Sequence, residues 1–294
     1  MDLILARSRL LDGAEAVAEV RAVRSASIKF ADSRWKAPLD LLMNSGRITF
    51  FWTAFHFLQS AKLRNEKGGF AFLEYFKLYE GACRAAREGF RRYQPTFNSM
   101  YYGTQTPFGF RAHDGVPRYV KFRLIPGDRG PDSGIADPAT MVTLEQISDF
   151  RSYPDDPRGR NYLKDEYKAR VAAWPVAYIL QMALHEIRPD GSPEILNSNV
   201  PWDEATHPWM DAARVEVTEV LSYREAVLTA YSVAHLPPAM RVLPARSIHD
   251  YNSINYMRAR EWPAVWVRML MIAILGLPEE YAGDGPRNYR PPGM

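Results

Sequence analysis

Three side chains near the end of the sequence could form a binding site on one face of a helix. In the stretch NSINYMRAREWPAVWVRM, residues 252–269, a helical periodicity brings Arg258, Trp262 and Arg268 to one side. Two interpretations are open: Trp262 packs the helix against the rest of the fold, or its indole stacks on a flat ligand in a pocket. The second interpretation requires the remainder of the chain to supply such a pocket.

The whole chain is rich in aromatic side chains. Of its 294 residues, 13% are aromatic, with 16 Tyr, 14 Phe and 7 Trp, and 47% are hydrophobic. A chain of this composition either packs a large aromatic core or lines a pocket for a large flat ligand. The composition therefore agrees with both interpretations of Trp262.

No other residue pattern indicates a catalytic or metal-binding class. The histidines lack the spacing of metal ligands, and we expect each to be a surface or hydrogen-bonded histidine. They are His56, His113, His185, His207, His235 and His249. The Gly-x-Ser-x-Gly nucleophile motif and Gly-rich phosphate loops are absent from the sequence. Asp155 and Asp156 stand in a predicted turn near Arg158 and Arg160, which argues against a paired-carboxylate site.

The charge balance and the single cysteine narrow the class of protein. Lys plus Arg number 37 and Asp plus Glu 34, a net charge of +3, and no basic run would make a nucleic-acid-binding stripe. Cys83 alone cannot form an internal disulfide, so we expect a reducing compartment, the cytoplasm. The start, MDLILARSRLLDG, lacks the apolar core of a signal peptide, and no stretch is long enough for a transmembrane segment.

Hydrophobic periodicity predicts a mixture of strands and helices. The predicted strands are 26–31, two runs on either side of a hairpin turn at 112–115, 174–187 and 213–222. The predicted helices are 47–63, 69–93 with losses of periodicity at Gly81 and Gly89, a short helix in 144–150 and 253–275. Residues 126–161 otherwise read as loop.

This order of elements predicts the fold class. Strands interleaved with helices, without regular βαβ alternation, indicate an α+β fold in which helices pack outside an antiparallel sheet or barrel. We expect one domain over residues 1–280 and an extended C-terminal tail over 281–294.

The segments also resemble the catalases. VRSASIKF followed by PLDLLMNSGRITFFWTAFHFLQSA is similar to the catalase stretch in which an Arg-Gly-x-Ala-x-Lys-Phe strand leads to an Asp-Leu-x-x-Asn turn, a Phe-Phe pair and a helix. YYGTQTPFGF with YVKFRLIPGD resembles the next hairpin of the smaller catalase-related proteins, and AAWPVAYILQMAL resembles the strand after it. The resemblance spans roughly residues 5–270. It implies an antiparallel β-barrel of catalase type with surrounding and C-terminal helices.

The resemblance implies positions around a haem cofactor. The family's proximal helix carries Arg-x-x-x-Tyr, whose tyrosinate ligates the iron, and Arg258 stands at the arginine position. The ligand position is Trp262, and an indole nitrogen is a donor only, so it cannot be an ordinary axial ligand. Asn44 matches the distal asparagine, and Phe51 of the Phe-Phe pair is expected to contact the haem. The distal histidine has no counterpart in the sequence: either the sequence is truncated before that point, or the protein lacks this histidine.

A second stretch of the sequence resembles the haem-ligand motif of the large catalases. RSYPDDPRGRNY, residues 151–162, would make Tyr153 the ligand. The arginine expected four residues earlier is Asp149, and the stretch precedes the strand that it should follow. We therefore interpret this stretch as a loop.

Two functions follow from the resemblance. The first is a haem oxidoreductase of catalase or peroxidase type, acting on hydrogen peroxide or on an organic, lipid hydroperoxide. The second is a degenerate catalase fold without haem that binds an apolar ligand or a partner protein. Because catalase relatives are often oligomers, the resemblance also implies a homo-oligomer or a second chain that completes the barrel.

Overall fold

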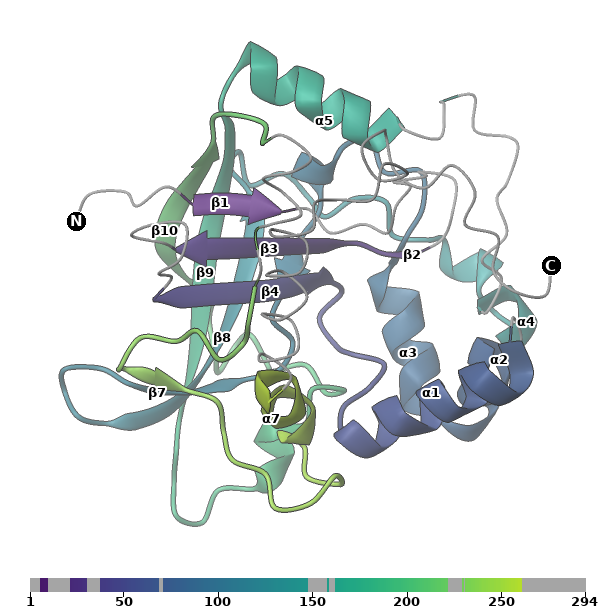
Figure 1. The fold of residues 1–294 in the computed structure, drawn as a ribbon, viewed down its shortest axis with the longest axis vertical. Coiled ribbons are helices and arrows are strands. Elements are labelled where there is room, and N and C mark those ends of the chain that lie inside the picture. The colour runs from purple at the N-terminus through teal and green to yellow at the C-terminus, as the bar shows by residue number, and fades with distance from the viewer. Residues whose placement is uncertain are drawn as a thin grey trace, which may run out of the picture.

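The framework is a curled antiparallel sheet with helices gathered on one side (Figure 1). The computed structural model describes residues 6–9, 22–30, 38–68, 71–147, 158, 162–221, 229 and 231–260. Trp262, Tyr153 and the predicted tail 281–294 lie outside the described residues.

Within those ranges, nine strands form the main sheet. They are β1 (Ala6–Arg9), β3 (Ser25–Phe30), β4 (Leu39–Ser45), β6 (Tyr102–Gly103), β7 (Phe108–Arg111), β8 (Pro117–Pro126), β9 (Val176–Glu186), β10 (Met210–Val217) and β11 (Met240–Arg241). A separate ribbon pairs β2 (Ala22–Val23) with β5 (Phe90–Arg91).

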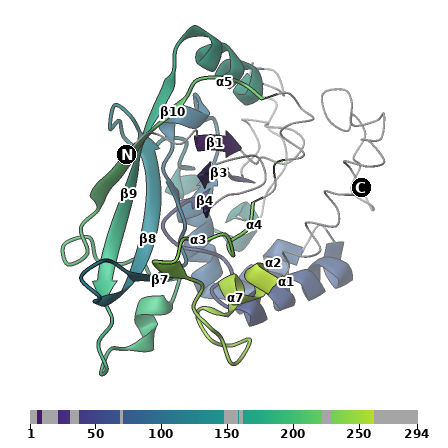
Figure 2. The same cartoon turned by 60° about the vertical axis from the view of Figure 1, so that its left-hand side comes forward.

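The order of the strands confirms the predicted fold class. Hydrogen bonds link them as β1-β3-β4-β6-β8-β9-β10, with β7 pairing to β8 and β11 to β7. All these pairs are antiparallel. β10 comes back beside β1, so the sheet curls into a half-barrel, with β8 and β9 as its long curved wall (Figure 2).

The alternation of side chains in β3 and β4 decides which face of this hairpin lines the core. Ala26 and Ile28 on β3, with Leu41 and Met43 on β4, are at most 1% exposed and belong to the main core cluster. Because side chains alternate along a strand, Asn44 projects to the opposite face. The hairpin therefore buries its apolar face and leaves Asn44 outside the barrel core.

Most of the helices form a second layer with its own core, whereas the helix at 162–173 buries Leu163 and Val171 in the core of the main sheet. They are α1 (Ala54–Lys67), α2 (Ala71–Leu78), α3 (Glu80–Gly89), α4 (Leu144–Ile147), α5 (Tyr162–Ala173) and α7 (Ser253–Arg260), with 3₁₀ turns at Phe97–Ser99, Pro138–Thr140 and Pro193–Leu196. Tyr75, Phe76, Ala82, Ala86 and Phe90 are the buried centre of the cluster between α2 and α3. Within the described ranges, no helix is long and apolar enough to cross a membrane.

Two predicted helix boundaries are wrong. The first helix begins at Ala54 and not at Arg47, because Thr53 is extended and its side chain accepts the His56 N–H as the N-cap. The second predicted helix breaks at Tyr79, whose backbone is extended, and not at Gly81. Apolar periodicity continued through both points, so it could not show these breaks.

The structure also contains a helix that the periodicity did not predict. α5 buries only Leu163 and Val171, so its sequence carries a faint apolar pattern. The predicted strand 26–31, the hairpin around 112–115, the short helix in 144–150 and the strand 174–187 are confirmed. The strand predicted at 213–222 is found at Met210–Val217, three residues earlier at its start and five at its end. The last predicted helix is confirmed over Ser253–Arg260.

Candidate functional site

Asn44 lies at the C-terminal end of β4, where its side chain meets the neighbouring strand. Ser25, its partner in the register of β3, donates a hydrogen bond from Oγ to Asn44 Oδ1 over 2.7 Å. Because Oδ1 accepts this bond, the amide nitrogen presents its two N–H groups as donors. Asn44 is half-buried, so a bound molecule can reach these donors.

The backbone next to Asn44 is fixed from the other face of the strand. The buried hydroxyl of Ser45 accepts the Arg24 N–H over 3.0 Å and donates to the Gly89 carbonyl over 2.6 Å. Gly46 follows with φ +87, and a Cβ built there would lie 2.7 Å from Gly89 Cα. Only glycine satisfies both the positive φ and this close approach, so the turn holds the end of β4 against α3.

Phe51 lies in the turn between β4 and α1, inside a group of aromatic rings. Its ring centroid is 6.0 Å from that of Phe50, 5.6 Å from Phe57 and 5.5 Å from Tyr75. The Tyr75 hydroxyl donates to the Phe50 carbonyl over 2.9 Å. These contacts place Phe51 against α1 and α2 as part of the helical layer, and a contact with haem remains a prediction.

His56 on the first turn of α1 belongs to the same aromatic region. Its ring lies 3.7 Å from the Trp52 ring, centroid to centroid, and its Nδ1 is 2.7 Å from Thr53 Oγ1. Burial, followed by the charge of His249, lowers the pKa of His56 to about 4. The imidazole is therefore neutral at neutral pH, and it is hydrogen-bonded as the sequence predicted.

Arg258 lies on α7, which meets the N-terminus of α1. The Ala54 N–H donates to Ser253 Oγ over 2.8 Å, and the Phe55 N–H donates to the Ile248 carbonyl over 3.0 Å. Arg258 is half-buried, and its Nη1 donates to Asn255 Oδ1 over 3.4 Å. The turn carrying Phe51 thus runs from Asn44 to the helix that packs on α7, while Trp262 lies outside the described residues.

The face of β4 that carries Asn44 also holds a buried charged cluster that the sequence interpretation missed. Asp40 is 0% exposed and accepts hydrogen bonds from Lys29 Nζ over 2.7 and 2.8 Å. The Ser232 N–H donates to Asp40 Oδ2 over 2.9 Å, and His235 Nδ1 lies 2.8 Å from the same oxygen. An ionised carboxylate only accepts, so His235 Nδ1 carries the proton. The feature of the sequence that could have revealed this cluster was a lysine in one strand and an aspartate in the next.

A second missed cluster lies on the wall formed by β8 and β9. His185 Nδ1 is 2.6 Å from His207 Nε2, although the two residues are far apart in sequence. Burial lowers the pKa of His185, and His207 and Arg188 lower it further. Lys121 is 5% exposed, its Nζ lies 4.8 Å from the centre of the Trp202 ring, and burial lowers its pKa to about 7. Among the described residues, no group of three or more His, Cys, Asp or Glu could hold a metal ion.

Comparison with known proteins connects this geometry to a family. The chain is 35% identical over 250 residues to the allene oxide synthase-lipoxygenase protein of Plexaura homomalla, covering 84% of this chain and 23% of that protein. It is 33% identical over 180 residues to the uncharacterized protein y4iK of Sinorhizobium fredii, covering 60% of this chain and 76% of that protein. No protein-family model matches the chain.

Solved structures share the fold. A fungal catalase superposes with a TM-score of 0.66 at 12% identity, over 96% of this chain and 54% of that chain. Catalase A from Saccharomyces cerevisiae gives 0.65 at 12% identity, over 98% and 60%. The chain therefore has the catalase fold and is related in sequence to the allene oxide synthase-lipoxygenase protein over 84% of its own length. It spans less than a quarter of the allene oxide synthase-lipoxygenase protein and little more than half of the catalases.

Asn44 and Phe51 are residues that the sequence resemblance places at a haem site. Asn44 offers N–H donors from a fixed amide, and Phe51 lies in the turn that follows it. Position 262 holds an indole, which has no lone pair to give to iron. The residue at the expected ligand position therefore does not fit haem iron, and a haem site at Asn44 and Phe51 stays a prediction.

Proposed function

We propose that the chain is an oxidoreductase that acts on a hydroperoxide, with an organic, lipid hydroperoxide preferred over hydrogen peroxide. The preference rests on the relative at 35% identity, which bears the name allene oxide synthase-lipoxygenase. We further propose that the protein works in the cytoplasm, as its single cysteine predicts, and that it forms a homo-oligomer or binds a second chain that completes the barrel, as the sequence resemblance implies.

The observation that carries this proposal is the hydrogen bond from Ser25 to Asn44 Oδ1. It turns the amide oxygen toward Ser25 and leaves the N–H groups as donors on the side away from the serine. Two such donors can bind the oxygen atoms of a hydroperoxide and stabilise the negative charge that develops when the O–O bond breaks. Asn44 cannot accept and return a proton as a histidine does, so its role is binding and electrostatic stabilisation.

We propose haem as the cofactor, with Asn44, Phe51, Arg258 and Trp262 as the residues that would hold it. Haem would supply the redox chemistry at the O–O bond. The guanidinium of Arg258 would favour an anionic group near the ring, and Trp262 would stack on the ring without ligating the metal. Phe51 would form part of the apolar wall.

The alternative function is a haem-free binding protein for an apolar ligand or a partner protein. The indole at position 262 favours it, because a tryptophan can line an apolar pocket and cannot replace a tyrosinate ligand. In this alternative the chain has the same fold but does not catalyse a redox reaction.

One experiment separates the two functions. The full chain is expressed with a haem precursor, and its Soret absorption and its consumption of linoleic acid hydroperoxide and hydrogen peroxide are measured. The proposed oxidoreductase shows a Soret band and consumes the lipid hydroperoxide faster, with at least a tenfold loss in Asn44→Ala. No Soret band and no turnover would overturn it and leave the binding protein.

A further inference from the structure

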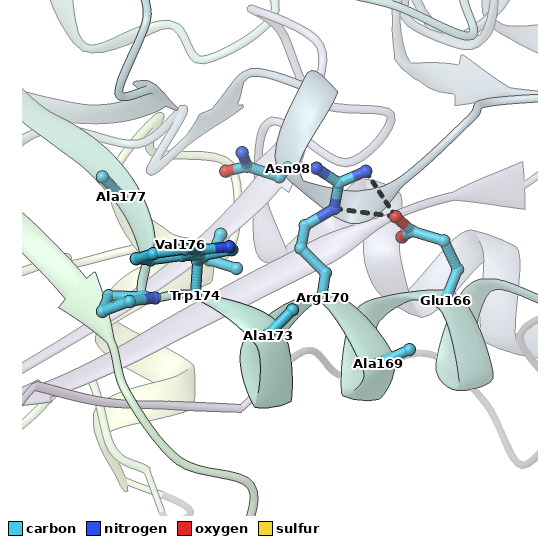
Figure 3. A pocket seen from close by; sticks show the side chains of 9 residues that line it. Asn98, Glu166, Ala169, Arg170, Ala173, Trp174, Val176 and Ala177 are labelled. Carbon is cyan, nitrogen blue, oxygen red and sulfur yellow. Dashed lines mark hydrogen bonds and ion pairs between the residues drawn. The ribbon is translucent and has the colours of Figure 1, made fainter.

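Two features of the sheet wall have no role in the proposed oxidoreductase. The first is a pocket of about 450 Å³ between α5 and the start of β9 (Figure 3). Its carboxylate, Glu166, accepts from Arg170 Nε over 2.7 Å, and Glu166 Oε2 and Asn98 Oδ1 are closed to solvent. The lining therefore presents no open side-chain acceptor to a ligand. The second feature is the pair of histidines His185 and His207, whose ring nitrogens face each other.

This histidine pair lies on the outer face of β9. Leu184 packs against the barrel core, so strand alternation directs the next side chain, His185, away from that core. The segment after β9 turns back over this face and brings His207 Nε2 to 2.6 Å from His185 Nδ1. The Trp202 ring closes the group, with its centroid 6.0 Å from that of His185 and 5.4 Å from that of His207. Its Nε1 donates to the Ile195 carbonyl over 2.8 Å, which fixes the indole beside the pair.

The hydrogen bonds of His207 leave a lone pair on the nitrogen that faces His185. The Thr206 hydroxyl donates to the Asp203 carbonyl over 3.2 Å. His207 Nδ1 lies 2.9 Å from this hydroxyl oxygen and 3.3 Å from the same carbonyl oxygen. Because both oxygens act as acceptors, Nδ1 carries the proton and Nε2 carries the lone pair. A backbone carbonyl that accepts from the second ring nitrogen is a common partner of metal-binding imidazoles.

The distance between the facing nitrogens suits two ligands at adjacent positions of one metal ion. Imidazole binds late transition metals at about 2.0–2.1 Å, so two imidazoles at a right angle place their nitrogens about 2.9 Å apart. The observed 2.6 Å requires the rings to open only slightly, whereas a tetrahedral ion holds such nitrogens about 3.3 Å apart. Both rings are half-exposed, so water can take the remaining positions. Burial holds the pKa of His185 below its usual value, so protons compete little for this imidazole at neutral pH.

We propose that His185 Nδ1 and His207 Nε2 bind one divalent late transition metal ion, with Cu²⁺ and Ni²⁺ preferred to Zn²⁺. Imidazole suits these ions, and Cu²⁺ binds a nitrogen site most tightly among the divalent ions. Hard ions such as Mg²⁺ prefer oxygen ligands and should not bind. His185 becomes a ligand when its proton moves from Nδ1 to Nε2, without a change of charge. The ion ties the segment after β9 to the sheet, and the site requires neither haem nor a hydroperoxide.

The test is a calorimetric titration of the full chain, freed of metal by a chelator and then dialysed, with the chlorides of Cu²⁺, Ni²⁺, Zn²⁺ and Mg²⁺. We expect one Ni²⁺ per chain, a lower dissociation constant for Ni²⁺ and Cu²⁺ than for Zn²⁺, and no heat of binding with Mg²⁺. Absence of Ni²⁺ and Cu²⁺ binding would show that the pair is joined by a hydrogen bond only and would overturn the proposal.

Variants assign the ion to this pair. His185→Gln and His207→Gln each remove one of the two protein ligands and should weaken Ni²⁺ binding about a hundredfold. Thr206→Val removes one of the two acceptors that orient His207 and should weaken it about tenfold. His113→Gln, in the exposed turn of the β7–β8 hairpin, is the matched control and should bind Ni²⁺ as the parent does. Equal dissociation constants in the parent and both ligand variants would contradict the proposal.

Melting temperatures separate loss of the site from loss of the fold. With a chelator present, the variants should melt within a few degrees of the parent, because every changed side chain is exposed or half-exposed. Added Ni²⁺ should raise the melting temperature of the parent and of His113→Gln, since a ligand stabilises the state that binds it. It should leave His185→Gln and His207→Gln unchanged. An equal rise in these two variants would place the ion elsewhere on the chain and refute the site.

Discussion

Ser25 and Asn44 are paired across β3 and β4 by a hydrogen bond of 2.7 Å between Oγ and Oδ1. The bond selects one orientation of the amide and directs its N–H groups away from the serine. A serine stands here where the catalase strand pattern has glycine, so this orientation comes from a side chain that the pattern lacks.

The first prediction concerns this serine as a positioning residue. Ser25→Ala removes the bond, lets the amide turn over, and should reduce hydroperoxide turnover by about tenfold, in line with the loss of one hydrogen bond. Ser25→Thr keeps the hydroxyl and should retain most of the activity. Steady-state rates with linoleic acid hydroperoxide measure both, and equal rates in the parent and Ser25→Ala would refute the positioning role.

The second prediction concerns the position at which the family has tyrosine. Trp262→Tyr introduces a phenol four residues after Arg258, whose charge would favour the phenolate form that can ligate ferric iron. The variant should show a more intense and shifted Soret band than the parent after expression with a haem precursor. Trp266→Tyr, four residues further along the sequence, is the matched control. An identical Soret spectrum in both variants would place position 262 away from any haem.

The third prediction concerns the buried cluster around Asp40. Asp40→Ala leaves the Lys29 ammonium, in a side chain 6% exposed, without its carboxylate. Removing one partner of a buried ion pair costs about 3–5 kcal/mol of unfolding free energy. Urea denaturation measures the change. Asp114→Ala, which removes an exposed partner of Arg118 on the β7–β8 hairpin, should have a much smaller effect, and equal losses in the two variants would argue against the cluster.

The fourth prediction concerns Lys121. Its pKa is about 7 in the folded protein because the amine is buried, and about 10.4 in the unfolded chain. Between these values the unfolded chain binds more protons, so the free energy of unfolding rises with pH from about 7 to about 10. Lys121→Met should remove this slope and stabilise the protein most at pH 7 and below. Urea denaturation at several pH values checks it, and an unchanged slope in the variant would contradict the buried amine.

The fifth prediction concerns His56. Its pKa is about 4 when folded and about 6.5 when unfolded, so the unfolded chain again binds more protons between these values. The free energy of unfolding contributed by this residue should therefore rise with pH from about 4 to 6.5 and then level off. His56→Gln should flatten this rise in unfolding free energy. His113→Gln, in the exposed turn of the β7–β8 hairpin, should leave the rise unchanged. Parallel denaturation series for the three proteins give the comparison.

The sequence by itself determined the fold class and located β3, β7, β8, β9 and β10, whereas β4, the strand that carries Asn44, was not among the predicted strands. Alternation in 26–31, 174–187 and 213–222 records which side chains face the core, because one face of each strand is buried. The order of motifs in the linear chain also made Asn44 and Phe51 candidate site residues, which stay a prediction. Helix α5, which the sequence did not predict, buries two residues only, so its sequence shows little apolar periodicity.

Only the tertiary structure decided which distant groups meet. Asp40 and His235 come together because the segment before β11 packs along β4, and His185 meets His207 because the chain after β9 folds back over the sheet. The pairing of Ser25 with Asn44 needs the register of the hairpin, and the pocket at Glu166 needs α5 to lie over the start of β9. Such contacts depend on loop paths and strand register, which hydrophobic patterning constrains weakly.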